Sequence, residues 1–349
     1  MQQQIAAVRR AKSALGDSKL DAVVGTLEGV VRAQERRNAI KTEILDLTNA
    51  SVSEVRKTRR RRSVRIGEAV FLPSWRDSAY GLPNALIRSS LFSVETATCA
   101  ERKVAVLDLP ISAHGDVVLK LTGLRLLDYD RQVFAAALSA YRDDAALSSG
   151  DDGAWLQLSF WQFAGLMGVS YGLKVHIAIR ESLVRLNAAH LRLRAKRRDV
   201  PLPRLIDVAF DDGYEELAAD PGNLKGSDLI SFRVPEGMAE LFGPTCWTAV
   251  PAVALTEYAG LTRWLTTFYS THADPYGMSV QDLYDHSGSN CGLREFRRRL
   301  KNALVQLEDP NTPDEIRVAA TVYEKATNRA KDKVTVYLAR WNHVDRLTK

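Results

Sequence analysis

An internal repeat is the feature of this sequence that most restricts how the chain can fold. Five residues recur at the same spacing 120 residues further along the chain. They are Ser159, Phe163, Gly168, Gly172 and Leu173 in the first copy, and Ser279, Leu283, Gly288, Gly292 and Leu293 in the second. With one residue inserted, SLVRL at 182–186 also recurs as ALVQL at 303–307. A repeat on this scale predicts one supersecondary unit built twice in tandem.

The expected secondary structure follows the same order in both copies, because apolar residues recur with the helical or the strand period between turn residues. The first copy is predicted to form helix 127–142, strand 155–159, short helix 160–168, long helix 172–189 and a hairpin of 190–198 with 203–213. The second is predicted to form helix 253–271, strand 276–280, short helix 281–288, long helix 291–308 and a hairpin of 316–324 with 333–341. This is the order of a winged helix, a helix-turn-helix followed by a β-hairpin wing.

These patterns predict an α+β chain, mainly helical, with two tandem winged-helix domains. A chain of 349 residues is long enough for that number of cores. We expect domain 1 at 104–243 and domain 2 at 244–349, preceded by a connecting and docking segment at 66–103 and a basic N-terminal arm at 1–65.

The long helix of the second copy, CGLREFRRRLKNALVQLE at 291–308, carries two different faces. Its apolar residues recur at steps of three and four, as on a helix that packs on a core. They are Leu293, Phe296, Leu300, Leu304 and Leu307. Within the eight residues 294–301 its basic residues are Arg294, Arg297, Arg298, Arg299 and Lys301, against one acid, Glu295. A charge run alone is typical of a solvated helix, but the second helix of a helix-turn-helix needs both faces, one for its bundle and one for the DNA major groove. We therefore expect the basic face to bind phosphates and guanine edges.

Further basic residues are predicted to contact DNA beside this helix and in the first copy. The second wing carries Lys325, Arg329, Lys331 and Lys333. The long helix of the first copy contributes Lys174 and Arg180, and its wing contributes Arg192, Arg194, Lys196, Arg197 and Arg198. Ile177 and Ile179 leave open whether part of that helix is a dimer or interdomain surface instead.

The N-terminal segment holds the excess of positive over negative charge in the chain. Residues 1–65 contain 15 Lys/Arg and 7 Asp/Glu, and the whole chain has a net charge of +6. The segment ends in Arg56, Lys57, Arg59, Arg60, Arg61, Arg62 and Arg65. Such a block is typical of a disordered or loosely helical segment. It is either a nucleic-acid arm or a solvated linker.

Composition argues against several other classes of protein. No apolar run approaches the roughly 20 residues that cross a bilayer, and the N-terminus lacks a secretory pattern, so we expect a cytoplasmic protein without membrane contact. Cys99, Cys246 and Cys291 are odd in number and far apart, which argues against disulfides and against a zinc ligand pair. The six histidines form no metal-binding spacing and no phosphate-binding loop of the ATPase type occurs, so no metal and no cofactor are expected.

Two short stretches resemble the TrfA family of plasmid replication initiators. LPNALIRSSLF at 82–92 resembles the Pro-Asn, Arg-Ser and Leu-Phe pattern of that family, and FYSTHADPY at 268–276 resembles its Ser, His and Pro-Tyr pattern. The resemblance spans residues 70 to 340. It implies two winged-helix domains that bind repeated origin sequences (iterons) in double-stranded DNA. It also implies recruitment of a host helicase and its loader, and a homodimer that dissociates before productive binding.

The sequence departs from this family at the peptide that some members use to bind the polymerase sliding clamp. Their Gln-Leu-Ser-Leu-Phe motif precedes the Pro-Asn stretch, where this chain has IGEAVFLPSWRDS at 66–78. QLSF does occur at 157–160, but Leu158 and Phe160 are expected in the core there. The sliding clamp therefore stays a partner without a clear binding motif.

Two alternative functions remain beside the initiator. A transcriptional regulator or a plasmid partition protein would use the same winged helices. A DNA-cleaving enzyme is less well supported, because His343 and Arg346 have the spacing of a recombinase motif but no tyrosine follows them. The acidic pairs at 151–152 and 211–212 are in polar loops typical of solvated carboxylates. We expect no enzymatic activity.

Overall fold

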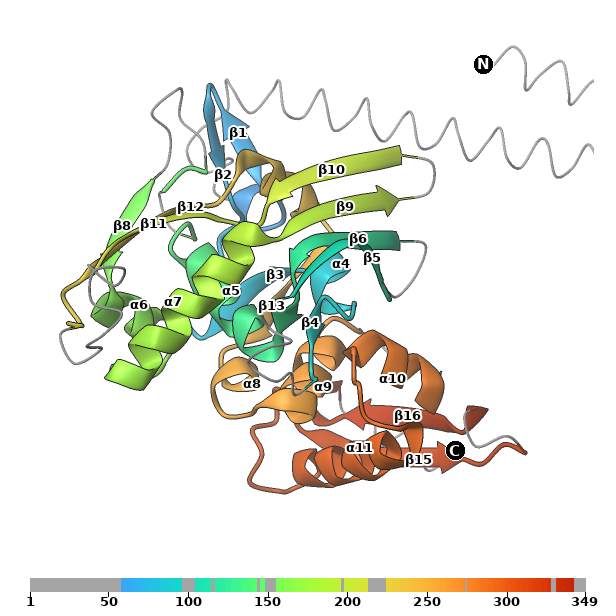
Figure 1. Cartoon of the computed structure of the whole chain (residues 1–349). Coiled ribbons are helices and arrows are strands. Elements are labelled where there is room, and N and C mark those ends of the chain that lie inside the picture. Colours follow the sequence, from blue (N-terminus) through green and yellow to red (C-terminus); the bar gives the residue numbers. More distant parts are fainter. Residues whose placement is uncertain are drawn as a thin grey trace, which may run out of the picture. The chain divides into compact units, whose positions relative to one another are not determined.

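The computed structural model describes residues 58–95, 104–113, 117–142, 145–147, 155–195, 198–212, 224–273, 275–327 and 331–341. The chain divides into two units, Met1–Thr58 with Val64–Gly67, and Arg59–Ser63 with Glu68–Lys349. Strand β1 (Val64–Ile66) is the described element of the first unit. Every other element below belongs to the larger unit (Figure 1). Among the described residues, none of the helices has the length and apolar character that crossing a bilayer requires.

The second copy of the repeat forms the elements in the predicted order. Helix α9 (Gly260–Ser270) is followed by β14 (Met278–Ser279), α10 (Val280–Ser287), α11 (Leu293–Leu307), β15 (Val318–Glu324) and β16 (Lys333–Leu338). The three strands form one antiparallel sheet in the order β14-β16-β15. Apolar side chains of all these elements, among them Trp264, Leu283, Phe296 and Val336, form one buried cluster.

The first copy has the same elements and the same sheet order. Its helices are α5 (Asp128–Ser139), α6 (Phe160–Leu166) and α7 (Leu173–Ala188). Strands β8 (Leu156–Ser159), β11 (Asp207–Asp211) and β12 (Leu229–Arg233) form an antiparallel sheet in the order β8-β12-β11. This order matches β14-β16-β15 strand for strand.

Equivalent residues have the same structural roles in the two copies, which confirms the repeat. The hydroxyl oxygens of Ser159 and Ser279 cap α6 and α10 by accepting a hydrogen bond from the backbone N–H three residues later. Gly168 and Gly288 have φ of 70° and 65°, a left-handed conformation that glycine adopts without strain. Phe163 and Leu283 are fully buried. Gly172 and Gly292 then precede α7 and α11 directly.

The predicted wing of the first copy is wrong. Apart from Arg204, which lies opposite His190, residues 203–213 do not pair with 190–198. Instead β9 (His190–Ala195) pairs with the strand next to it in sequence, β10 (Arg198–Arg204). These two strands belong to a separate four-stranded sheet, in the order β10-β9-β6-β5, with β6 (Val117–Leu124) and β5 (Ala105–Ile111). The strands that correspond to a wing are β11 and β12, which lie further along the chain.

The first helix of the second copy also differs from its prediction. Residues 253–271 were expected to form one helix, but the chain forms α8 (Val253–Thr256) and α9, separated at Glu257 to Ala259. Val250, Ala254 and Leu255 belong to the larger buried cluster around the first copy, and the second cluster begins at Trp264. The break in the helix therefore coincides with the change from one core to the other.

The remaining elements complete the larger core. They are β2 (Ala69–Phe71), β3 (Ala79–Pro83), α4 (Asn84–Ile87), β4 (Phe92–Ser93), β7 (Leu126–Leu127), β13 (Trp247–Pro251) and the 3-10 helix η3 (Glu236–Leu241). A second 3-10 helix, η5 (Ala339–Trp341), follows β16 in the second copy. Strand β13 pairs with β3 and β4 pairs with β7. The protein is α+β, and the expectation of a mainly helical chain is not confirmed, because strands and α-helices occupy about equal parts of the described residues.

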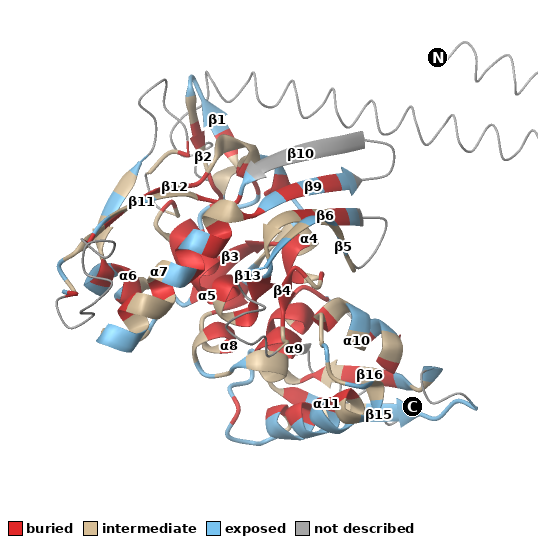
Figure 2. Cartoon of the chain, viewed as in Figure 1, coloured by how far each residue is buried: buried red, intermediate tan, exposed pale blue. Residues whose placement is uncertain are grey.

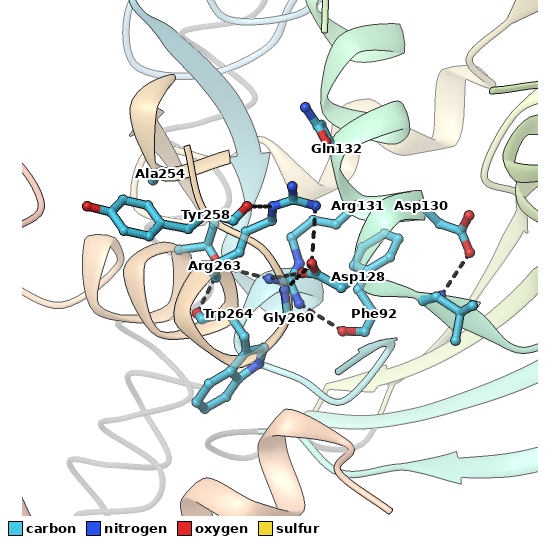
Figure 3. Close-up of polar contacts among 12 residues, drawn as sticks. Phe92, Asp128, Asp130, Arg131, Gln132, Ala254, Tyr258, Gly260, Arg263 and Trp264 are labelled. Carbon is cyan, nitrogen blue, oxygen red and sulfur yellow. Dashed lines mark hydrogen bonds and ion pairs between the residues drawn. The ribbon is translucent and has the colours of Figure 1, made fainter. Parts of the chain in front are cut away.

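A buried ionic cluster connects α5 to α9 (Figure 3). Arg263 Nη1 donates to Asp128 Oδ2 over 3.1 Å, and the backbone N–H of Gly260 donates to the same oxygen over 2.9 Å. Arg131, which is fully buried, lies 3.3 Å from the other oxygen of Asp128 and donates to Thr267 Oγ1 and to the carbonyl of Phe92. Burial lowers the pKa of Arg131 to about 10. The two repeats are therefore held together by charged groups that have little access to water.

Candidate nucleic-acid interface

The turn between α10 and α11 is fixed by close contacts with strand β4. Ser93 Oγ donates to the carbonyl of Gly288 over 2.5 Å, and the backbone N–H of Val94 donates to the carbonyl of Ser287 over 3.0 Å. A Cβ atom on Gly288 would lie 3.0 Å from Ser93 Oγ. The start of α11 is therefore set by the turn and by its contact with the larger core.

One face of α11 is buried as the sequence predicts. Phe296, Leu300, Leu304 and Leu307 are at most 1% exposed, and Leu293 at the start of the helix is partly buried. Ala303 completes the stripe at 5% exposure. This face packs in the second cluster, against α9 and the sheet of β14, β15 and β16 (Figure 1). The orientation of the opposite face is thereby determined.

The opposite face of α11 is exposed to solvent and largely cationic (Figure 2). Its exposed residues are Arg294, Arg298, Arg299, Lys301, Asn302, Val305 and Gln306. Within the described part of the chain, the side chains of Arg294 and Lys301 have no hydrogen-bond or ion-pair partner. These two cations are therefore available to a polyanion without breaking an internal contact.

Two other arginines of this face share one carboxylate. Arg298 donates to both oxygens of Glu295 over 2.8 and 2.7 Å, and Arg299 Nε donates to one of them over 3.0 Å. Hydrogen bonds from Arg298 and Arg299 lower the pKa of Glu295 to about 2. The carboxylate stays ionised at neutral pH, so it offsets part of the positive charge and restricts the orientation of the Arg298 guanidinium.

Arg297 has a structural partner, although it was predicted to bind DNA. Its Nη2 atom lies 3.6 Å from Asp332 Oδ2, and the two side chains are 29% and 17% exposed. Asp332 also accepts a hydrogen bond from the backbone N–H of Ala326 over 2.9 Å. Arg297 therefore connects the flank of α11 to the loop between β15 and β16.

The hairpin of β15 and β16, which was predicted to be a wing, presents lysines to solvent. Lys325, Lys331 and Lys333 are exposed at the ends of β15 and β16. Arg329 lies outside the described residues. The wing therefore adds three cations to those of α11, at the end of the hairpin next to Asp332.

The long helix of the first copy differs from α11 in the use of its arginines. Arg180 Nε donates to Asp212 Oδ2 over 2.8 Å, and its guanidinium lies 4.5 Å from the ring centre of Phe210. Arg185 makes a bidentate pair with Asp130. Arg180 therefore has a partner inside the fold, next to the end of strand β11, and its predicted contact with DNA stays a prediction. Lys174 is exposed.

The basic residues predicted on the first wing lie on the four-stranded sheet instead. Arg192 and Arg194 are exposed on β9, and Arg192 lies 3.7 Å from Asp108. Lys120 of β6, opposite Arg192 in the register, is 3.9 Å from the same carboxylate. Lys196 and Arg197 lie outside the described residues, and of Arg198 only the backbone is described, in β10.

Residues 59–63 of the predicted basic arm belong to the larger unit. Arg59 donates to the carbonyls of Leu72 and Arg142, both over 2.9 Å, and Arg62 is 6% exposed. Arg59 is therefore hydrogen-bonded to the fold and Arg62 is buried in it, so neither side chain is fully solvated. Arg60, Arg61 and Arg65 are exposed, and Arg56 and Lys57 lie outside the described residues.

The QLSF sequence at 157–160 is part of the fold, as predicted. Phe160 is fully buried and stacks on the imidazole of His176 with ring centres 3.5 Å apart. Leu158 is partly buried and packs against the larger cluster. This segment does not present a free clamp-binding peptide.

Asn302, an uncharged residue on the exposed face of α11, is not among the residues predicted to bind DNA. It lies one helical turn after Arg298, and that spacing was the signal that could have revealed it. A search for positive charge alone passes over it.

No family model matches the chain, and no curated protein matches it. Two crystal structures of RctB domains 2 and 3 overlap with part of it. In the first, a selenomethionine derivative, the matched region covers 70% of this chain and 95% of the RctB chain, at 14% identity and a TM-score of 0.44. The other covers 74% and 98% at 14% identity and a TM-score of 0.45. At this identity and overlap the likeness assigns no function. Among the described residues no three His, Cys, Asp or Glu side chains gather as a metal site.

Proposed function

We propose that the chain is a sequence-specific double-stranded DNA-binding protein that initiates plasmid replication at repeated origin sequences. In this proposal the two repeats are winged helices, and α11 is the helix that enters the major groove. The observation that carries it is the division of α11 into a fully buried apolar stripe and an opposite face with Arg294, Arg298 and Lys301 exposed. The protein acts by binding, without catalysing a reaction.

Affinity for DNA would come mainly from cations that the fold leaves available. Each phosphate neutralised by Lys or Arg releases counterions, so binding weakens as salt rises. Arg294 and Lys301 on α11, with Lys325, Lys331 and Lys333 on the wing, are exposed on one repeat. The wing is oriented relative to α11 by the Arg297–Asp332 pair, so helix and wing form one surface.

The two repeats would contribute unequally. The exposed residues of α7 are Leu173, Lys174, Glu181 and Val184, which is one cation against one acid. We therefore assign most DNA contacts to the second repeat. The first repeat supports it through the Asp128, Arg131 and Arg263 cluster and adds the exposed Arg192 and Arg194 of β9.

The proposal of an initiator rests on the resemblance to the TrfA family. The two stretches that carry the resemblance are in contact: Arg88 of the first donates through Nε to Thr271 Oγ1 of the second over 2.7 Å, and through Nη2 to its carbonyl. Residues that resemble a family pattern therefore meet at one place in the fold. The same proposal includes recruitment of a host helicase and its loader, and a homodimer that dissociates before productive origin binding.

Footprinting of the full chain on the DNA element that carries its gene tests this function. We expect protection of a series of direct repeats, and loss of that protection in an Arg294→Ala/Lys301→Ala variant that keeps its melting temperature. Protection of one promoter-proximal operator without repeats would favour a transcriptional regulator. No protected sequence at physiological salt would contradict specific DNA binding.

A further inference from the structure

Asn302 occupies an unusual position for an asparagine in the middle of a helix. It lies inside α11, is exposed, and has no hydrogen-bond partner within the part of the chain that the structure describes. Asparagine stabilises a helix interior less than alanine, because its amide competes for backbone hydrogen bonds. The fold therefore gains nothing from the Asn302 amide.

The neighbour of Asn302 one turn earlier is Arg298, which Glu295 holds in a bidentate pair. Arg294, Arg298 and Asn302 follow one another at intervals of four and form a single ridge on the helix. This ridge lies opposite the stripe of Phe296, Leu300 and Leu307. It is thus the part of α11 that would reach deepest into a groove.

We propose that Asn302 and Arg298 together read an adenine and a guanine of the DNA target, with Glu295 as the residue that positions Arg298. This inference rests on the proposed DNA-binding function and specifies what its main helix recognises. An asparagine side chain matches the N6 and N7 atoms of adenine in the major groove, and an arginine matches O6 and N7 of guanine.

The spacing of the two side chains sets the spacing of the two bases. Four residues of α-helix advance about 6 Å along the axis, and successive base pairs are about 3.4 Å apart. The adenine and the guanine should therefore be separated by about two base-pair steps. The exposed side of α7 offers neither an arginine nor an asparagine, so this recognition belongs to the second repeat alone.

The test is selection of bound duplexes from a randomised library, followed by sequencing, with the full chain. We compare the sequences selected by the unaltered protein with those selected by Asn302→Ala, Asn302→Asp and Glu295→Gln. Gln306→Ala is the matched control, because Gln306 is an exposed amide of the same helix whose Oε1 accepts a hydrogen bond from Thr262 of α9 over 3.1 Å. Alanine is a better helix former than asparagine, so Asn302→Ala should not unfold α11.

We expect Asn302→Ala to discriminate one adenine from the other bases about 5- to 150-fold less well than the unaltered protein does. Its discrimination at the other positions should not change. Asn302→Asp should change the preference at that base pair towards cytosine, whose N4 amino group donates to a carboxylate. Glu295→Gln should bind random duplexes more tightly, because a negative charge is removed, and should discriminate less at the guanine. Gln306→Ala should select the same sequences as the unaltered protein.

Two different failures can be told apart. If the unaltered protein selects a sequence and Asn302→Ala selects the same one with equal stringency, the inference about Asn302 is wrong and the DNA-binding function stands. If Glu295→Gln keeps full discrimination at the guanine, the proposal that Glu295 positions Arg298 is wrong. If the unaltered protein selects no sequence at all, the proposed function fails and the inference fails with it.

Discussion

Arg297 on α11 lies beside Asp332 in the wing, with Nη2 3.6 Å from Oδ2. Its neighbour Arg298 points instead to Glu295 on the exposed face. Adjacent arginines of one helix therefore have different roles. The first pairs with Asp332 beside strand β16, and the second pairs with Glu295 on the exposed face of α11.

The Arg297–Asp332 pair predicts a measurable coupling in stability. Arg297→Met and Asp332→Asn should each destabilise the protein, and the double variant should lose less than the sum of the two, with a coupling of about 1 kcal/mol for a partly buried pair. Denaturant unfolding of the four proteins gives this value. Additive losses would mean that the pair does not join α11 to the wing.

The two glycines that flank the turn before α11 should respond oppositely to the same substitution. Gly288 has φ of 65° and a Cβ there would lie 3.0 Å from Ser93 Oγ, whereas a Cβ on Gly292 would meet nothing within 4 Å. Gly288→Ser should cost about 1 to 2 kcal/mol or more for the left-handed conformation. Gly292→Ser should be neutral or stabilising, because serine is a good N-cap. Equal melting temperatures for the two variants would refute this account of the turn.

Removal of Asp128 should destabilise the fold strongly. Arg131 is fully buried and Arg263 is 7% exposed, so Asp128→Asn leaves both guanidinium groups with less compensation. Breaking a buried pair from one side costs about 3 to 5 kcal/mol. Asp282→Asn on the exposed side of α10 is the control and should change stability by less than about 0.5 kcal/mol. A loss for Asp128→Asn no larger than that of the control would show that the cluster is not structural.

Glu295 predicts a dependence of stability on acid. Its pKa is lowered from 4.5 to about 2 by hydrogen bonds from Arg298 and Arg299. A carboxyl group with a depressed folded-state pKa contributes stability above its unfolded pKa and loses it as the pH falls through the folded value. We therefore expect the stability difference between the unaltered protein and Glu295→Gln to be constant above pH 5 and to shrink between about pH 4.5 and 2. Melting curves at these pH values measure it. A difference that does not change with pH would mean that Glu295 is not paired in solution.

Much of the fold was predictable because its signals are local. Ser159 and Ser279 are typical of the start of a helix, and Gly168 and Gly288 are typical of a left-handed turn. The apolar stripe that includes Phe296 and Leu300 predicts the buried face of α11. Each of these signals depends on residues within one or two turns of the helix. The repeat made them visible twice.

The errors concern partners that are distant in sequence. The strand after α7 was taken for a wing, but the register that decides this joins β8 to β12, some 70 residues further on. Arg180 and Arg298 look alike in the sequence, and only the structure shows that Arg180 donates a hydrogen bond to Asp212, 32 residues away; its contact with DNA stays a prediction. Helical spacing alone also could not separate Arg297 from Arg298, because Asp332 belongs to the wing.

The central claim is that the exposed face of α11 contacts DNA, and the salt dependence of binding tests it most directly. Arg294→Ala and Lys301→Ala each remove one exposed cation of α11, whereas Arg76→Ala removes an exposed cation of the loop before β3. On the selected duplex, each of the first two variants should bind more weakly and lower the slope of log K against log salt by about one unit. Arg76→Ala should change neither the affinity nor the slope. Unchanged slopes for both α11 variants, with the fold intact, would contradict the assignment of this helix to the interface.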